Sequence, residues 1–340
     1  AVTADPVLVA AGDIACDPTS VSFNGGLGTV SPPACQAAAT AAEIKSIAPQ
    51  YLLPMGDEQY IDSAVQGTMP PLSYYTQSYN ATWGKLASTQ GGVVPNANIH
   101  PVAGNHEYGD LLETGAGPYA TGANYFTNFG PTGLMQLPSS VTGPTNDWYS
   151  YNIAVNGGRW HVAALDSECG VVGGCGSGSP EETWFAKDLA ANAGVCTLVY
   201  WHQPRWESGP VINDPNYTAF WNDAVAHQVA IVLNGHAHLY QHFAPMDANG
   251  NAASTGTSEF IVGTGGESLE SYAPTPPPTI VSQDDADFGA LKLGLHAGSA
   301  SYAFQTTSGT VPDSGTVACP NSTVPTVSSV SPVAGPASGG

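Results

Sequence analysis

The sequence predicts a layered α/β domain, because short apolar segments alternate with helical patterns along the chain. Continuously apolar segments that end in a polar or glycine-containing turn are typical of buried strands. They read VLVAAGD, YLLPMGD, IHPVAGN, WHVAALDS, TLVYWH, VAIVLNGH and FIVGTGG. In such a sheet, polar residues at the strand ends gather at one edge, where ligands bind beyond the carboxyl ends of the strands.

Segments between these strands carry helix signals. PACQAAATAAEIKSIA starts with prolines and is rich in Ala, and NYTAFWNDAVAHQ is a second candidate. In SPEETWFAKDLAANAG, Ser179 is the expected N-cap, Glu182 follows three residues later, and Gly194 is the expected C-terminal cap. Residues 66–148 are rich in Gly, Pro, Asn and Tyr, which predicts long loops around the sheet edge.

The charge balance limits the class of partner. The chain has 340 residues, 6 Lys and Arg against 27 Asp and Glu, and a formal net charge of −21. A surface this acidic repels nucleic-acid backbones and anionic membranes. No apolar run approaches the roughly 20 residues of a membrane span. An acidic chain can still act on a phosphate if metal ions supply the positive charge.

The cysteines suggest an exported protein. They number six, and no zinc-ribbon spacing appears. An even count in a chain rich in Gly, Ser, Thr and Pro indicates disulfides and a secreted location. We expect the pairs Cys16–Cys35, Cys169–Cys175 and Cys196–Cys319, because the first two close short loops. The alternative is buried free thiols in a cytosolic protein. No signal peptide is visible, so the start of the chain is expected to be a processed one.

Side chains that can bind metals follow the apolar segments. They are Asp13, Asp57, Asn105, His202, His236 and His238, together with Tyr60 three residues past Asp57. A parallel sheet would bring them to one edge, where a mixed set of oxygen and nitrogen donors suits Zn, Fe or Mn. Taken singly, a Gly-Asp turn or a lone buried His has an ordinary structural explanation. The whole set in this order is far more specific than any member.

In the order GDIA, GDEQY, GNHE, VYWH and GHAH, these blocks resemble the calcineurin-like metallophosphoesterases, and among them the purple acid phosphatases. The resemblance covers about residues 5–320 and implies a β-sandwich flanked by helices, with a dinuclear metal site at the carboxyl ends of the strands. It implies one metal held by Asp13, Asp57, Tyr60 and His238, and a second held by Asp57, Asn105, His202 and His236. Asp57 would bridge the two metals, which the resemblance implies are Fe(III) with Zn, Fe or Mn.

One departure from the family pattern favours the tyrosine-ligated branch. The family usually has Gly two residues after the first Asp, and other branches, including cyclic-nucleotide phosphodiesterases, have His there. This chain has Ala15 at that position, and a methyl group cannot bind a metal. Tyr60 is the natural replacement ligand.

The expected chemistry is hydrolysis of phosphoric esters. Two cations about 3.5–4 Å apart can clamp a phosphate, and a water between them becomes the nucleophile near neutral pH. With Asp57, His106 is the expected catalytic residue, acting as general acid for the leaving alkoxide, while Glu107 orients a neighbour. The residues expected to bind substrate are Asn105, His106, His202 and His242.

The leading prediction is therefore a secreted phosphomonoesterase acting on a small-molecule phosphate ester. A phosphodiesterase acting on nucleotides, glycerophosphodiesters or phospholipid head groups is the first alternative. A non-catalytic secreted binding or adhesion protein is the second, and the C-terminal tail motivates it.

The tail after Cys319 differs in composition from the rest of the chain. It reads PNSTVPTVSSVSPVAGPASGG, which has the composition of a linker. It also resembles the opening of an IPT/TIG domain, an immunoglobulin-like module. The matching residues are Pro325, Val327, Ser329, Pro332, Gly335, Pro336, Gly339 and Gly340. We therefore expect a catalytic domain over residues 1–320, and over 321–340 a linker with the start of an Ig-like domain that continues in a longer chain.

Overall fold

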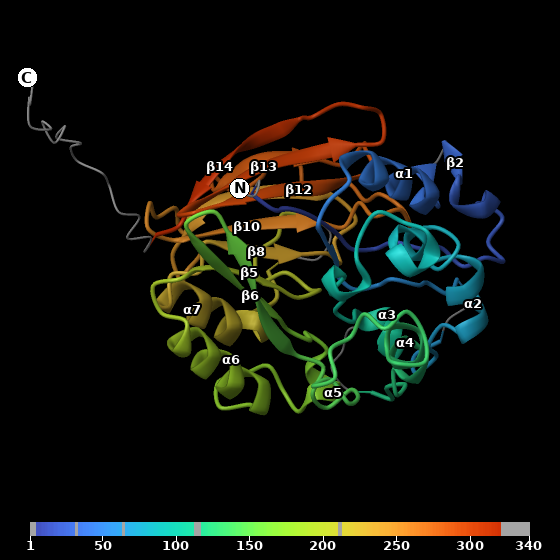
Figure 1. Cartoon of the computed structure of the whole chain (residues 1–340), viewed down its shortest axis with the longest axis horizontal. Coiled ribbons are helices and arrows are strands. Elements are labelled where there is room, and N and C mark those ends of the chain that lie inside the picture. Colours follow the sequence, from blue (N-terminus) through green and yellow to red (C-terminus); the bar gives the residue numbers. More distant parts are fainter. Residues whose placement is uncertain (1–4, 31–32, 63–64, 112–116, 210–212, 321–340) are drawn as a thin grey trace, which may run out of the picture.

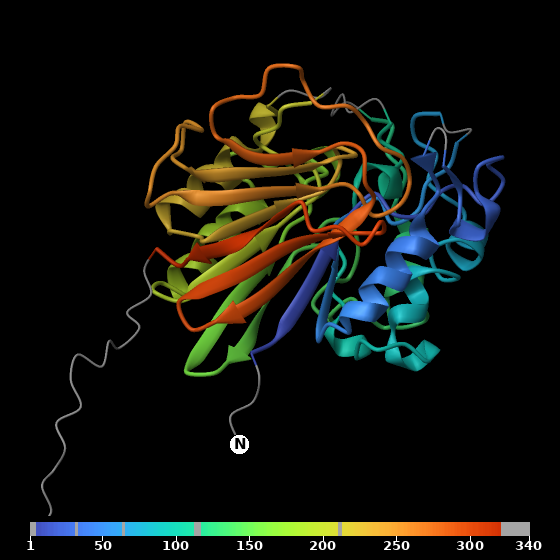
Figure 2. The same cartoon turned by 90° about the horizontal axis from the view of Figure 1, so that it is seen from above.

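Two β-sheets pack face to face in the computed structural model, which describes residues 5–30, 33–62, 65–111, 117–209 and 213–320 (Figures 1 and 2). The smaller sheet has five strands in the order β14-β13-β12-β1-β4. Their bounds are β14 Asp313–Ala318, β13 Ser299–Thr306, β12 Gly289–His296, β1 Val7–Ala11 and β4 Tyr51–Pro54. β1 and β4 run parallel, and the remaining pairs in this sheet are antiparallel.

The larger sheet has seven strands in the order β11-β9-β10-β8-β7-β6-β5. Their bounds are β11 Ile280–Asp284, β9 Tyr240–Met246, β10 Thr257–Val262, β8 Ile231–Asn234, β7 Cys196–Tyr200, β6 Gly158–Ala164 and β5 Tyr149–Val155. β6, β7, β8 and β10 run parallel, so their carboxyl ends meet at one edge. A small hairpin, β2 (Thr29–Val30) and β3 (Pro33–Ala34), precedes the first helix.

Helices cover both sides of the sandwich (Figure 1). Their bounds are α1 Ala37–Ile47, α2 Leu72–Gln77, α3 Asn105–Tyr108, α4 Ala123–Phe129, α5 Cys169–Val172, α6 Pro180–Ala191 and α7 Thr218–Ala226, with single turns of 3-10 helix at 24–26, 83–86, 88–90, 96–98 and 215–217. Phe185 of α6 and Phe220 of α7 pack with Val232 on the outer face of the larger sheet. A second core, which includes Leu8 and Phe260, fills the space between the sheets. The two cores fix the strands and therefore the edge at which the polar residues gather.

The layered α/β prediction is confirmed, with two corrections at the level of elements. The segment IHPVAGN forms no strand and makes only two isolated bridges. Ile99 pairs with Leu52 of β4, and Val102 pairs with Met55, which directly follows β4. Pro54 has no N–H, so it cannot donate the hydrogen bond that would continue the ladder. The second correction concerns the end of α6: the helix ends at Ala191 and its C-cap is Asn192, not Gly194, whereas its start at the N-cap Ser179 is as predicted.

The three predicted disulfides are confirmed: Cys16–Cys35, Cys169–Cys175 and Cys196–Cys319. No helix within the described residues is long and apolar enough to cross a membrane. The segment 321–340, with its resemblance to an Ig-like domain, lies outside the described residues.

Candidate metal centre

Three of the predicted ligands occupy an unusual backbone conformation directly after their strands. Asp13, Asp57 and His236 have φ values of 61°, 50° and 70°, in the left-handed region that residues other than glycine seldom adopt. Such conformations cost energy and persist where the surrounding structure requires them, often at functional sites. Here the left-handed residue turns the chain sharply at the end of β1, β4 and β8, and brings the three side chains to one edge.

Asp13 and Asp57 divide their carboxylate oxygens between the backbone and the centre of the site. One oxygen of each accepts an N–H: Asp13 Oδ2 from His236 at 2.8 Å and Asp57 Oδ1 from His106 at 2.9 Å. The other oxygens, Asp13 Oδ1 and Asp57 Oδ2, both lie within 2.9 Å of the Tyr60 hydroxyl. Both carboxylates are buried. The backbone bonds hold the free oxygens in fixed positions, as a metal site requires.

The Tyr60 hydroxyl lies where the first metal is expected to bind. Besides the two carboxylates, its oxygen lies 2.9 Å from His238 Nε2. The backbone also holds the loop that carries Tyr60, because the Ala15 carbonyl accepts the Tyr60 N–H at 2.8 Å. Burial, together with the charges of Asp13 and Asp57, raises the pKa of Tyr60 well above its usual range. A bound cation would reverse this effect, because it stabilises the deprotonated oxygen of a ligand.

The two histidines that face this centre are oriented through their Nδ1 atoms. His202 Nδ1 lies 2.8 Å from the Met55 carbonyl oxygen, to which it donates a proton, so that in the neutral ring Nε2 carries the lone pair. His238 Nδ1 lies 2.8 Å from Ser268 Oγ and 3.3 Å from Glu267 Oε2. Each Nε2 therefore faces the site, 3.2 Å from a carboxylate oxygen of Asp57 and Asp13 respectively.

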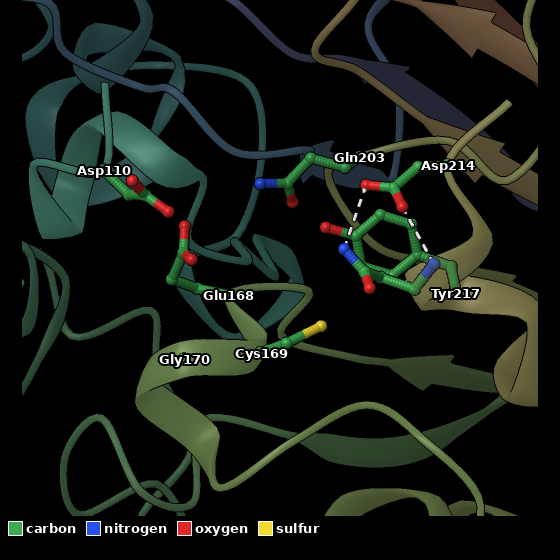
Figure 3. A pocket seen from close by; sticks show the side chains of 8 residues that line it. Asp110, Glu168, Cys169, Gly170, Gln203, Asp214 and Tyr217 are labelled. Atoms are coloured by element: carbon green, nitrogen blue, oxygen red, sulfur yellow. Dashed lines mark hydrogen bonds between the residues drawn. The ribbon is translucent and has the colours of Figure 1, made fainter. Parts of the chain in front are cut away.

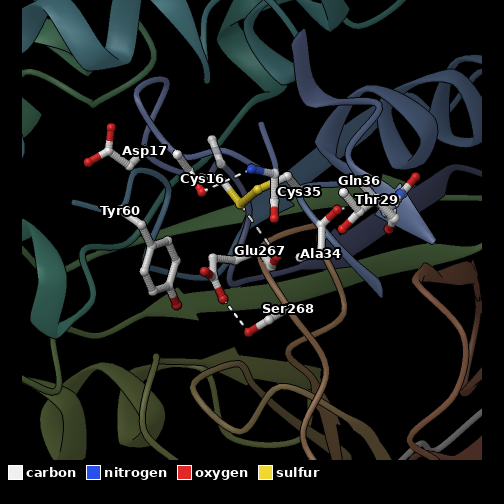
Figure 4. The surroundings of a disulfide bond; sticks show 12 residues. Cys16, Asp17, Thr29, Ala34, Cys35, Gln36, Tyr60, Glu267 and Ser268 are labelled. Carbon is white, nitrogen blue, oxygen red and sulfur yellow. Dashed lines mark hydrogen bonds between the residues drawn. A yellow bond between two sulfur atoms is a disulfide. The ribbon is translucent and has the colours of Figure 1, made fainter. Parts of the chain in front are cut away.

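Glu267 and Ser268 are held next to the site by the first disulfide (Figure 4). The Cys35 N–H donates to the Glu267 carbonyl at 2.7 Å, and Cys16 Sγ approaches the same oxygen at 3.4 Å. The Ser268 hydroxyl in turn donates to the Glu267 carboxylate. The Cys16–Cys35 bridge thus supports the residues that orient the His238 ring.

The second half of the predicted ligand set lies on the other side of Asp57. Metal-binding atoms of Asp57, His202 and His236 lie within 4.8 Å of one another. Asn105 donates its Nδ2 proton to the Asp110 carbonyl at 3.0 Å, which leaves Oδ1 buried and without a hydrogen-bond partner among the described residues. A buried amide oxygen without a partner is costly, and a metal ion would satisfy it.

Glu107 fixes the two turns that carry Asp57 and Asn105. Its carboxylate accepts the N–H groups of Asp57 and Gly104, both at 2.9 Å. Gly104 is also required sterically, because a Cβ at this position would overlap the Asp57 carboxylate and approach its backbone N to 2.5 Å. The prediction that Glu107 orients a neighbour agrees with these contacts.

The described residues fit a dinuclear metal site. Their buried carboxylates, two imidazole Nε2 atoms aimed inward, a tyrosine hydroxyl and an unpartnered amide oxygen match the donor set of Zn, Fe and Mn sites. A cavity of about 170 Å³ opens onto them, lined by Asp57, Tyr60, Asn105, His106, His236, His238 and Glu270. Five of the predicted ligands line this cavity, whereas Asp13 and His202 are fully buried and do not reach it.

His242 does not belong to this group, and the prediction that it binds substrate disagrees with its position. Its Nδ1 lies 2.9 Å from Asp313 Oδ2, and its ring stacks on Phe260 at 4.1 Å between centroids. It lines a different cavity, together with Tyr302 and Pro245. The reason is strand alternation: the GHAH block precedes β9, whereas His242 lies within that strand and faces the neighbouring sheet.

A family model for calcineurin-like phosphoesterases matches residues 8–240, which is more than half of the chain. The chain belongs to the calcineurin-like phosphoesterase family. Members of this family use a dinuclear metal site, and the matched region contains every predicted ligand from Asp13 to His238. No curated protein matches the sequence.

Solved structures of the same fold include a purple acid phosphatase from yellow lupin seeds (Lupinus luteus), with a TM-score of 0.62 and 18% identity. That similarity covers 94% of this chain and 54% of the lupin chain, so this chain spans about half the length of that protein. GAP50, the anchor in the inner membrane complex of Plasmodium, has a TM-score of 0.59 and 13% identity over 93% of this chain and 90% of its own. A dimetal phosphatase from Danio rerio has a TM-score of 0.53 and 12% identity over 93% and 100%.

Sequence reasoning missed the acidic residues that follow β10. Glu267 contacts His238, and Glu270 lines the cavity beside the predicted ligands. Both belong to the stretch GTGGESLE, which continues a predicted strand end in the same way as the other ligand-bearing turns. A carboxylate after the seventh predicted strand end was therefore a readable signal.

Proposed function

We propose that this chain is a secreted, dinuclear metal-dependent phosphomonoesterase resembling the purple acid phosphatases. The observation that carries the proposal is the Tyr60 hydroxyl, whose oxygen lies within 2.9 Å of side-chain atoms of Asp13, Asp57 and His238. Three disulfides agree with an extracellular location. The proposed metals are Fe(III) paired with Zn, Fe or Mn.

Under this proposal Asp13, Asp57, Tyr60 and His238 hold one metal, and Asp57, Asn105, His202 and His236 hold the other. When bound, the two cations supply positive charge for the phosphate and acidify the water that attacks phosphorus. The chain's own residues fix the positions of these ligands through the contacts of Met55, Glu107, Glu267 and Ser268. Asp13, Asp57, His202 and His238 do not have to move for substrate to bind, because each side chain is also held by a hydrogen bond from outside the metal centre.

His106 is the proposed proton donor to the leaving group. Its ring lies 4.1 Å from the Tyr60 ring between centroids, and its Nε2 lies 3.8 Å from Asp57 Oδ2. The side chain is 22% exposed and lines the cavity, so it reaches both the centre and a bound ester. We expect His106→Ala to lower kcat about 10²–10⁴-fold for an alkyl phosphate, whose leaving alkoxide needs a proton.

The measurement compares kcat for an alkyl phosphate and for p-nitrophenyl phosphate in the wild type and in His106→Ala. p-Nitrophenolate leaves without protonation, so the loss should be much smaller for this ester. An equal loss for both esters would assign His106 to substrate binding instead. His227→Ala, in a half-buried histidine just after α7, is the matched control and should leave both rates unchanged.

Glu270 gives a specific reason to keep the phosphodiesterase as a second candidate. Its carboxylate lines the cavity, and the described lining includes no Lys or Arg. A monoester dianion is repelled by Glu270 more strongly than a diester monoanion. We expect Glu270→Gln to raise kcat/KM for a monoester about two- to fivefold, with a smaller change for a diester. Glu43→Gln, on α1, removes one charge elsewhere and should alter neither.

The experiment that tests the proposed function is hydrolysis of p-nitrophenyl phosphate and bis-p-nitrophenyl phosphate side by side, with and without a chelator. Chelator-sensitive hydrolysis with higher kcat/KM for the monoester is the expected result. A preference for the diester would replace the monoesterase by a phosphodiesterase. No hydrolysis of either ester by the metal-loaded protein would favour the non-catalytic binding protein. The presence of every predicted ligand type in this chain argues against that alternative.

A further inference from the structure

A second cavity brings two buried carboxylates face to face (Figure 3). Asp110, just after α3, and Glu168, just before α5, are 2% and 4% exposed. They line a cavity of about 30 Å³ together with Cys169, Gly170, Gln203, Asp214, Asn216 and Tyr217. None of these residues lines the cavity of the metal centre.

This pair of acids has no cationic side chain beside it. One oxygen of Asp110 accepts from Gln66 Nε2 at 2.6 Å, but Glu168 Oε2 is buried without a hydrogen-bond partner among the described residues. The described residues that line the cavity include no Lys, Arg or His. Burial, with the nearby Asp110 and Asp166, raises the pKa of Glu168 to about 10. A side-chain hydrogen bond with Asp110 contributes to this raised pKa, and Oε2 is the Glu168 oxygen left without a partner, which is costly in a buried site.

We propose that Asp110 and Glu168 bind a single Ca²⁺ ion in this cavity, apart from the dinuclear centre. Carboxylate and amide oxygens are hard donors, which favour Ca²⁺ or Mg²⁺ over the metals of imidazole sites. Ca²⁺ accepts irregular coordination at about 2.3–2.6 Å, whereas Mg²⁺ demands a near-ideal octahedron. The cavity exceeds the roughly 10–15 Å³ that one water needs, so it accommodates an ion with water completing the coordination.

Gln203 supplies the neutral oxygen of this site. The Ser167 hydroxyl donates to Gln203 Oε1, which leaves the amide nitrogen toward the two acids (Figure 3); with the amide turned over, the same hydroxyl would accept from Nε2. Either end of the amide can therefore face the cavity, and a cation selects the oxygen. In Figure 3 the Gln203 side chain extends between Asp214 and the Asp110–Glu168 pair. The ion would thus join three segments, of which those of Asp110 and Gln203 carry or adjoin proposed ligands of the dinuclear centre.

Binding of Ca²⁺ in this cavity would therefore stabilise the segments that form the wall of the dinuclear centre. The Asp110 carbonyl accepts from Asn105 Nδ2, and Gln203 follows His202 in the chain. An ion held by Asp110, Glu168 and Gln203 would restrict the movement of the segments that carry Asn105 and His202. Because it binds only the folded chain, it raises the melting temperature.

The test uses the full chain with its dinuclear centre loaded and without a chelator. Extracellular Ca²⁺ sites have dissociation constants of about 0.1–1 mM, so addition of about 1–10 mM CaCl₂ should raise Tm by about 2–4 °C. Equilibrium dialysis with ⁴⁵Ca²⁺ should show one ion bound per chain. Glu168→Gln and Asp110→Asn should each abolish the Tm shift and the bound ion, whereas Glu43→Gln should retain both.

A His236→Ala variant separates this site from the dinuclear centre. It should still bind one Ca²⁺, because His236 does not line the second cavity. The proposal is overturned if the wild type binds no ⁴⁵Ca²⁺ at 10 mM, which would leave Asp110 and Glu168 sharing a proton. It is equally overturned if Glu168→Gln binds the ion as the wild type does. Neither readout depends on hydrolysis, so the proposed function can fail independently.

Discussion

Asp57→Asn should lower kcat/KM for p-nitrophenyl phosphate by at least about 10³-fold, the largest effect expected from a single substitution in this chain. Asp57 is the only proposed ligand shared by both metals. Its Oδ2 lies 2.9 Å from the Tyr60 hydroxyl and 3.2 Å from His202 Nε2, which belong to different halves of the site. An amide at this position keeps the shape but loses the negative charge that both cations require.

Metal content and rate should be measured on the same preparation. We expect the bound metal to fall from two ions to one or fewer per chain, while circular dichroism stays unchanged. Asp62→Asn is the matched control, because this exposed acid lies on the same loop and should leave activity and metal content as in the wild type. Full metal content with full activity in Asp57→Asn would refute the bridging role and the dinuclear assignment with it.

The sequence was informative about this centre because each ligand follows a strand that the local pattern reveals. VLVAAGD, YLLPMGD and VAIVLNGH are continuous apolar segments with a polar end, and their strands β1, β4 and β8 end just before Asp13, Asp57 and His236. Parallel neighbours then place such ends together. The left-handed backbone of these residues could not be read from sequence, because Asp and His carry no signal that distinguishes it from an ordinary turn.

Long-range contacts explain what the sequence could not reveal. His242 shares a strand with residues close to the GHAH block, yet its partner Asp313 lies 71 residues away, and His242 lines a different cavity. The Asp110–Glu168 pair is separated by 58 residues and joins two turns with no common motif. IHPVAGN failed as a strand because its partner β4 ends in a proline that cannot donate. The local pattern of apolar residues does not indicate which distant residue packs against a given side chain.

Removing the Cys196–Cys319 disulfide should produce the largest loss of stability among the three bridges. It joins β7 of the larger sheet to the residue after β14 of the smaller sheet, across a sequence separation of 123 residues. Without the bridge, the unfolded chain regains the freedom of that whole loop. The chain-entropy relation gives a loss of about 4–5 kcal/mol for Cys196→Ser with Cys319→Ser.

The matched control is the double serine variant of Cys169–Cys175, which closes a separation of only 6 residues and should cost about 2 kcal/mol. Urea unfolding of both variants and the wild type measures the difference. Since Cys196 and Cys319 lie outside the cavity of the metal centre, the folded fraction of that variant should keep its hydrolytic rate below the unfolding transition. Equal losses for the two bridges would mean that strain or residual structure in the unfolded chain outweighs loop length. A greater loss for the longer loop would show that this bridge stabilises the sandwich by restricting the unfolded chain.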